Sequence, residues 1–270
     1  MHLDENGIYV LDKENNRVSY PNTGHDMCFG IEKNSFWFNH RNEIIYEILK
    51  KFPFAGNFAD IGGGNGYQAN FISQKFPEKE VFLIEPGYHG CLNAKKYGVK
   101  NVYNMLSGDF NFKINHIGGV GIFDVIEHIE NDIAFLKETA DSCDKNTLIY
   151  MAVPAYNFLW SDTDDYDGHY RRYNSKMVRN LAEKANVELL YLGYFMFYLP
   201  VPVFFARSLP YKIRGKRDND SIVAKENVEH NAGPMASFAL KLLNNFEIGC
   251  IRTFGRMIAG GSCMAVFKTK

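Results

Sequence analysis

Apolar residues along the chain alternate between two spacings, one typical of buried strands and one typical of helices. Between residues 57 and 153, short runs of consecutive apolar residues are separated by segments whose apolar residues lie three and four positions apart. The predicted strands are 58–61, 81–84, 101–105, 118–123 and 147–153, and the predicted helices between them are 67–76, 88–97 and 133–140. Because strands that are apolar on both faces alternate with helices, the pattern predicts βαβ units and a mostly parallel sheet.

The flanking segments extend this α/β pattern. Residues 8–11 and 17–20 have the spacing of a strand pair, and an uncharged stretch begins near residue 189. The other predicted elements are helices at 34–51, 177–185 (capped by Asn174 or Ser175) and 234–246, and strands at 187–195 and 262–268. We therefore expect an N-terminal hairpin extension over residues 1–30, then one domain over residues 31–270 with a lid or insert at about 196–233.

Composition narrows the class of protein. The 270 residues are 46% hydrophobic and 23% charged, with a net charge of −1, which is typical of a soluble globular protein and argues against bulk electrostatic binding of nucleic acid. Five scattered cysteines form neither a CxxC pair nor a Cys/His spacing suited to zinc. The polar, acidic N-terminus lacks the features of a signal peptide. We expect a cytoplasmic protein with free thiols, no metal and no nucleic-acid partner.

A glycine-rich turn follows the first strand of the alternating block. Asp60 lies near the end of that strand, glycines occupy positions 62, 63, 64 and 66, and a helix begins near Tyr67. Glycines permit positive φ and close approach of a ligand to the backbone, and the helix start offers unpaired N–H groups. Such a unit at the carboxyl end of a sheet is typical of a nucleotide-like cofactor site. Tyr67 stands where the third glycine of the dinucleotide fingerprint would pack, which argues against a nicotinamide cofactor.

Four motifs follow one another in order: DIGGGNG, FLIEP, SGDF and FDVIEHIEND. In these motifs and their spacing the chain resembles class I S-adenosylmethionine-dependent methyltransferases over roughly residues 34–200. The resemblance implies a Rossmann-like, doubly wound, seven-stranded sheet that is mostly parallel, with an antiparallel last strand. It implies S-adenosyl-L-methionine as the cofactor. It implies that Asp60, Gly62 and Gly64 hold the methionine part of the cofactor and that Glu85 binds the ribose. It implies Asp109 and Phe110 at the adenine.

The FDVIEHI segment leaves the fourth strand of the block at its carboxyl end. Asp124, Glu127 and His128 are therefore expected near the cofactor, with Asp124 as a cofactor-binding residue and His128 as a candidate base. In the alternative interpretation, Glu127 and His128 only cap and order the turn.

A polar and aromatic run follows the fifth strand of the block. It resembles the W-S…D…GHxRRY stretch of methyltransferases often encoded near cell-envelope sugar or lipid genes. His169 is the second candidate base, because its ordinary pKa suits proton transfer near neutrality. The candidate substrate-binding residues are Trp160, Arg171, Arg172 and Tyr173. The arginines either clamp a phosphate or carboxylate of the acceptor or pair with the aspartates at 162, 164, 165 and 167.

The FWF..R segment at 36–41 resembles the same group of methyltransferases. Trp37 and Arg41 are candidate substrate-binding residues, and the aromatic rings either roof the cofactor or acceptor or pack in the core.

The stretch 189–206 has no charged residue, which reaches the lower length limit for a membrane span. Pro200 and Pro202 interrupt it, and its first half is needed as a strand, so we do not expect a transmembrane helix. An apolar hairpin followed by the basic residues at 212–217 either contacts an anionic membrane peripherally, at its inner face, or closes as a lid.

These observations predict a methyltransferase that moves a methyl group to O or N of a small or lipid- or sugar-linked acceptor. The alternatives are a nicotinamide-dependent oxidoreductase built on the same type of sheet and a non-catalytic protein of methyltransferase-like fold that only binds a ligand.

Overall fold

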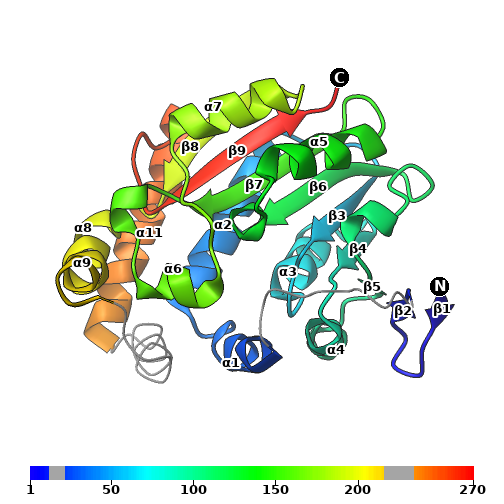
Figure 1. Cartoon of the computed structure of the whole chain (residues 1–270), viewed down its shortest axis with the longest axis horizontal. Helices are drawn as coiled ribbons and strands as arrows, with labels where there is room; N and C mark the ends of the chain where they lie inside the picture. Colours follow the sequence, from blue (N-terminus) through cyan, green and yellow to red (C-terminus); the bar gives the residue numbers. More distant parts are fainter. Residues whose placement is uncertain (12–21, 216–233) are drawn as a thin grey trace.

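One mixed β-sheet runs through the molecule, with helices on both of its faces (Figure 1). The computed structural model describes residues 1–11, 22–215 and 234–270. The strands are β1 (His2–Leu3), β2 (Tyr9–Val10), β3 (Asn57–Ile61), β4 (Val81–Ile84), β5 (Asn101–Asn104), β6 (Ile117–Phe123), β7 (Leu148–Pro154), β8 (Glu188–Phe195) and β9 (Ser262–Lys268). They lie in the order β1-β2-β5-β4-β3-β6-β7-β9-β8.

The order of the strands places a ligand crevice at the middle of the sheet. From β3 the chain proceeds outward to β4 and β5, and from β6 it proceeds in the opposite direction to β7. β9 is antiparallel to both of its neighbours, β7 and β8, whereas β3 to β7 are parallel. Open α/β sheets bind ligands outside the carboxyl ends of the strands where the order reverses, which here is between β3 and β6. The predicted doubly wound sheet with an antiparallel last strand is confirmed.

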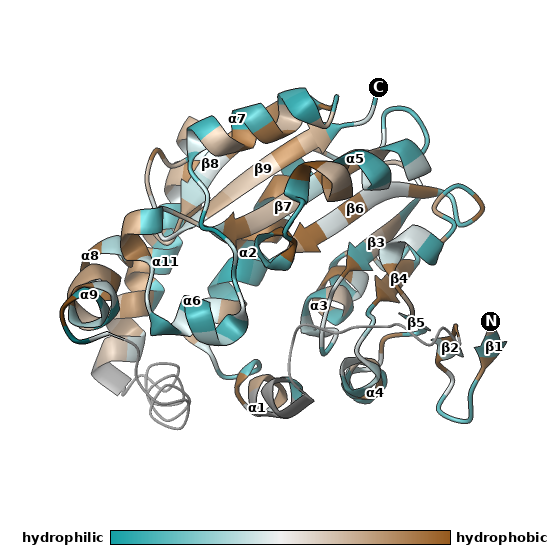
Figure 2. Cartoon of the chain, in the orientation of Figure 1, coloured by the Kyte–Doolittle hydropathy of each residue, from teal (hydrophilic) through white to brown (hydrophobic). Residues whose placement is uncertain are grey.

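Two layers of helices cover the sheet. The helices are α1 (Asn22–Ile31), α2 (Phe36–Lys51), α3 (Tyr67–Lys75), α4 (Tyr88–Tyr97), α5 (Asp132–Ser142), α6 (Asp162–Asp167), α7 (Ser175–Lys184), α8 (Pro200–Val203), α9 (Leu209–Arg214) and α11 (Pro234–Phe254). One apolar core lies between the sheet and α5 and α7, and the other contains buried residues of α2, α3, α4 and α11. In Figure 2 apolar residues, in brown, are frequent in the central strands, and polar residues, in teal, lie on the outer sides of the helices.

Most predicted strands and helices agree with the structure within one to three residues at each end. Asn174 caps α7 as expected, since its side chain accepts hydrogen bonds from the amides of Lys176 and Met177. Helix α11 is longer than predicted and ends at Phe254. β2 pairs with β1 and β5, and residues 17–20, its predicted partner strand, lie outside the described residues. Helix α1 was not predicted at all.

The predicted apolar hairpin after β8 is wrong. The chain continues there as α8, a π-helical turn η4 (Phe204–Ser208) and α9. The prolines explain the difference, because α8 and α9 each begin with one in the first turn, where the missing N–H costs nothing. Among the described residues, no helix combines the length and the apolar character that crossing a bilayer requires.

Candidate functional site

The glycine loop connects β3 to α3 at the crevice. Gly62, Gly64 and Gly66 all have positive φ, at 63°, 54° and 76°. A Cβ on Gly62 would lie 2.8 Å from a methyl carbon of Val125, whereas a Cβ on Gly64 would meet only the ring of His25, at 3.9 Å. The space beside the Cα atom of Gly64 is therefore open, whereas Gly62 is fixed by packing.

Two buried carboxyl groups flank this loop. Asp60 is 1% exposed at the end of β3, and its Oδ2 has no hydrogen-bond partner. Glu85 follows β4 and accepts hydrogen bonds from the amides of Gly64 (2.9 Å) and Gly87 (2.6 Å). Burial raises the pKa of each carboxyl group to about 7. The Arg41 charge partly opposes this rise for Asp60, and the two amide hydrogen bonds partly oppose it for Glu85. A ligand with hydroxyl or ammonium donors would restore the ionised form of both.

The two residues predicted at the adenine lie after β5. Asp109 is exposed at the end of the 3₁₀ turn η1 (Ser107–Asp109). Phe110 is buried in the core, and its ring centre lies 5.1 Å from those of Tyr103 and Phe112. The segment thus presents a carboxylate at the surface and anchors it by an adjacent apolar side chain.

Arg41 is a buried cation at the same edge of the sheet. Its Nη1 donates a hydrogen bond to Oδ2 of Asp124, and its guanidinium carbon lies 5.0 Å from the ring centre of Trp37. Its Nε has no hydrogen-bond partner. Asp124 has a positive φ of 55° directly after β6, a conformation that is uncommon outside glycine and that is often found at functional sites. The structure thus brings Arg41 and Trp37 of α2 together with Asp124.

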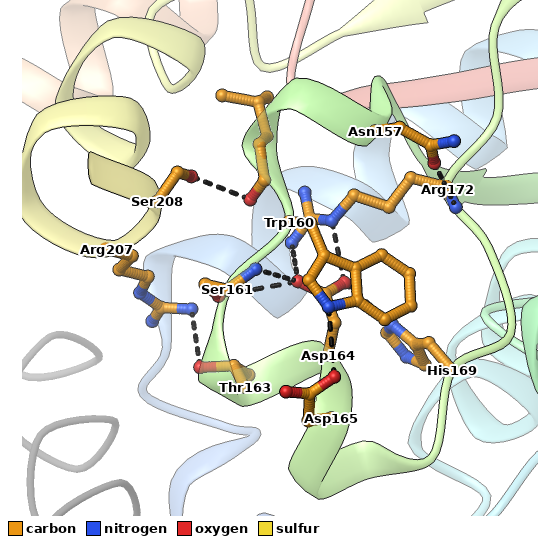
Figure 3. A network of polar contacts seen from close by, with 11 residues as sticks. Asn157, Trp160, Ser161, Thr163, Asp164, Asp165, His169, Arg172, Arg207 and Ser208 are labelled. Carbon is orange, nitrogen blue, oxygen red and sulfur yellow. Dashed lines mark hydrogen bonds and ion pairs between the residues drawn. The ribbon is translucent and has the colours of Figure 1, made fainter. Parts of the chain in front are cut away.

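The loop that carries His169 and Arg172 is organised by one aspartate (Figure 3). Asp164 in α6 has no exposed surface, and it accepts hydrogen bonds from the Ser161 amide (2.8 Å) and from Nε and Nη2 of Arg172 (2.6 and 2.8 Å). Nδ1 of His169 lies 2.9 Å from the same carboxylate. Burial alone would raise the pKa of Asp164, but the His169 hydrogen bond and the Arg172 charge lower it to about 2.

The other residues of this run also have partners within the chain. Arg171 donates to the carbonyl oxygens of Ile129 and Glu130 and lies 3.1 Å from the Asp132 carboxylate. The hydroxyl of the fully buried Tyr173 donates to Asp132 (2.9 Å), and Nε1 of Trp160 donates to Asp165 (3.0 Å). Arg172 thus pairs with Asp164, one of the four aspartates considered from the sequence, whereas Arg171 pairs with Asp132.

The two candidate bases face each other. The rings of His128 and His169 are 4.6 Å apart between centres and nearly perpendicular. Burial and the neighbouring His169 lower the pKa of His128 to about 4, so this imidazole is neutral and weakly basic. Glu127 is completely buried beside them, and burial and the Asp124 charge raise its pKa far above the usual range.

Residues of α1 and the turn after it also approach the glycine loop, and the sequence did not indicate them. Asn65 donates to the carbonyl oxygen of His25 (2.8 Å) and to Glu32 (3.3 Å). Burial raises the pKa of Glu32, while Tyr97 and Asn65 partly offset it. The one available signal was the presence of His25 and Glu32 shortly before the FWF segment, in a stretch that has no helical spacing of its own.

Comparison with known proteins identifies the fold. No family model matches the chain, and no curated protein matches its sequence. A phosphoethanolamine N-methyltransferase 2 from Haemonchus contortus, solved with S-adenosyl-L-methionine, superposes with a TM-score of 0.55 at 16% identity, over 94% of this chain and 58% of that chain. This chain therefore spans little more than half the length of that protein.

Two further structures agree. A possible histamine N-methyltransferase from Thermotoga maritima has a TM-score of 0.54 at 12% identity, over 92% of this chain and 96% of that chain. A putative sarcosine dimethylglycine methyltransferase from Galdieria sulphuraria has a TM-score of 0.53 at 12% identity, over 85% and 84%. The chain has the fold of S-adenosylmethionine-dependent methyltransferases.

Proposed function

We propose that this protein transfers a methyl group from S-adenosyl-L-methionine to an oxygen or nitrogen of a small or lipid- or sugar-linked acceptor. The observation that carries the proposal is the pair of buried carboxyls, Asp60 and Glu85, on either side of an open glycine backbone at the crevice. The cofactor brings a positively charged sulfonium and ammonium, a carboxylate and a ribose diol, and its methyl group is already activated for transfer.

The chain's own groups match these chemical features. The free Oδ2 of Asp60 can accept from the ammonium, and Glu85 can accept from the ribose hydroxyls once its carboxylate is ionised. Gly62 and Gly64 would allow the cofactor to approach the backbone closely, and Asp109 with Phe110 would contact the adenine. We place Arg41 at the cofactor's carboxylate rather than at the acceptor, because its guanidinium lies in the Asp60–Asp124 cluster and keeps Nε unpartnered.

Proton transfer from the acceptor then falls to a histidine. His169 is the better candidate base of the two, because Asp164 holds its Nδ1 at 2.9 Å and leaves Nε2 for the acceptor's proton. His128, with a pKa of about 4, takes up a proton poorly at neutral pH. Trp37 and Trp160 would enclose the acceptor, while Arg172, Arg171 and Tyr173 would support the loop through their internal partners.

A lipid-linked acceptor agrees with the surface of the C-terminal helices. Phe238, Leu242 and Phe246 lie at spacing four on one face of α11, with 65%, 55% and 59% of their surfaces exposed. Phe205 in η4 is also exposed, and Lys212, Arg214 and Lys241 add positive charge. This combination favours peripheral contact with an anionic membrane.

Vesicle sedimentation tests the membrane contact. Binding to vesicles with anionic phosphatidylglycerol should exceed binding to neutral phosphatidylcholine, and the double variant Phe205→Ser/Phe246→Ser should lose it. Ile114→Ser is the matched control, since Ile114 is more exposed (73%) than Phe205 (63%) and Phe246 (59%) but lies in the loop before β6. Equal sedimentation of the double variant and the control would exclude this surface as the site of membrane contact.

Isothermal titration tests the cofactor assignment. S-adenosyl-L-methionine should bind, NAD should not, and Asp60→Asn and Glu85→Gln should each weaken binding by at least about tenfold, the equivalent of one lost hydrogen bond to a charged group. Asp141→Asn, on the surface of α5, is the control. Binding of NAD alone would favour the oxidoreductase, and cofactor binding without turnover on any acceptor would favour the non-catalytic alternative.

A further inference from the structure

Two adjacent residues and a third from a distant loop converge beside the cofactor crevice. Glu127 and His128 come from the 3₁₀ turn η2 (Ile126–His128) after β6, and His169 comes from the loop after α6. One ligating atom from each, a carboxylate oxygen and two imidazole nitrogens, lies within 4.8 Å of the other two. The sequence indicated these residues singly but not as one cluster, because His169 lies far along the chain from the adjacent pair Glu127 and His128.

Glu127 is a buried acidic side chain without a partner among the described residues. Its relative exposure is 0%, and neither carboxylate oxygen has a hydrogen-bond partner. The charged Asp124 nearby makes ionisation still more costly. A buried carboxyl group without partners is expensive unless it is paired or coordinates a metal. Nδ1 of the adjacent His128 is likewise buried without a partner.

His169 has the orienting carboxylate partner that a metal-binding histidine usually has. Asp164 Oδ1 lies 2.9 Å from Nδ1, which fixes the ring and leaves Nε2 as the free coordinating atom. Asp164 is held in turn by the Arg172 guanidinium. The imidazole is thereby oriented by two successive buried interactions before any ligand arrives.

We propose that Glu127, His128 and His169 bind one divalent transition-metal ion, and that this ion orients an oxygen acceptor for methylation. One carboxylate and two imidazoles form a donor set that suits Zn²⁺ or Mn²⁺ and leaves coordination positions open. Bonds of about 2.1 Å place tetrahedral ligand atoms roughly 3.4 Å apart, so the side chains need to move inward by only about 1 Å.

The role of the ion rests on the proposed methyl transfer. An acceptor hydroxyl bound to the metal loses its proton to solvent more readily, and its oxygen then forms the bond to the methyl group as the sulfonium carbon–sulfur bond breaks. In this state His169 is a ligand and not the base. The ion would thus favour a hydroxyl acceptor over an amine, because a hydroxyl oxygen keeps a lone pair for attack when it is bound to a metal, whereas the one lone pair of a neutral amine is taken up by the metal.

Metal binding is measured without cofactor or acceptor, so its failure leaves the cofactor assignment untouched. Tag-free protein is treated with a chelator and titrated with Co²⁺, followed by visible absorption, and with Zn²⁺, followed by calorimetry. We expect one equivalent to bind, and Glu127→Gln, His128→Ala and His169→Ala each to abolish the Co²⁺ band. His89→Ala, on the exposed N-terminal turn of α4, should bind like the wild type.

Folding of each variant is checked by urea denaturation, in which a cooperative transition should be retained. The near-isosteric Glu127→Gln keeps the test valid if a histidine variant fails to fold. Asp164→Asn should weaken Zn²⁺ binding by roughly 10- to 100-fold, as expected for an orienting partner. Absence of Co²⁺ binding to the wild type, or binding that all three variants retain, would overturn the proposal.

Discussion

Asp164 should be the residue whose loss most destabilises the loop that carries His169. Its carboxylate, which has no exposed surface, accepts from a backbone amide and twice from Arg172, and lies within hydrogen-bond distance of His169. Asp164→Ala leaves the guanidinium of Arg172, which is 9% exposed, without its counter-charge. Removing one partner of such a buried pair costs about 3–5 kcal/mol of the free energy of unfolding.

The lowered pKa of Asp164 agrees in direction and corresponds to a smaller part of this free energy. A carboxyl group whose pKa falls from 3.8 to about 2 on folding contributes roughly 2 kcal/mol at neutral pH. Because the folded pKa is lowered, this contribution is present above pH 4 and is lost as the pH falls through about 2. The stability of Asp164→Asn should therefore depend less on pH between 4 and 2 than that of the wild type.

A double-mutant cycle measured by urea denaturation tests the reasoning. Asp164→Ala and Arg172→Met should each destabilise by about 3–5 kcal/mol, and the double variant by little more than either. The coupling free energy should be at least about 2 kcal/mol. Asp141→Ala, which breaks an exposed pair with Lys137, should change stability by less than about 0.5 kcal/mol. Additive losses at Asp164 and Arg172 would refute the buried-pair interpretation.

Three further predictions follow from the structure. Gly66→Ala should destabilise by roughly 2–4 kcal/mol in urea, since φ is +76° and its Cβ would lie 2.6 Å from a methyl group of α4; a loss below 1 kcal/mol would contradict it. Glu247→Ala should cost about 3 kcal/mol by the same assay, because it leaves His40 and two backbone amides without their buried acceptor, and an unchanged midpoint would refute this. Cofactor affinity should rise from pH 6 to 8 and then level off, because burial raises the pKa values of Asp60 and Glu85 to about 7 and binding favours their ionised forms; calorimetry showing a flat profile would exclude it.

The central sheet was predictable because each parallel strand is covered on both faces. Runs such as 81–84 must then be apolar at every position, and a run of that length between helical segments has few other interpretations. Helix α1 was not predictable in this way. Gly24 and Gly30 interrupt its sequence, and its helical form depends on tertiary contacts such as that between Phe29 and Tyr97.

The arginines show where sequence reasoning about the site ends. Motif spacing places Arg171 and Arg172 in one loop but cannot tell which side each guanidinium takes. In the fold, Arg172 turns to Asp164, eight residues away, whereas Arg171 reaches the segment before α5. The proximity of Glu127 and His169 likewise depends on the loop after α6 returning to the end of β6, a non-local contact that no local pattern encodes.

Transfer of label from methyl-tritiated S-adenosyl-L-methionine into fractionated cell extract tests the central claim most directly. Wild-type protein should label a small-molecule or lipid fraction, and Asp60→Ala should label none above background. Cofactor binding by the wild type, with no fraction labelled beyond the Asp60→Ala control, would contradict methyl transfer as the function of this fold.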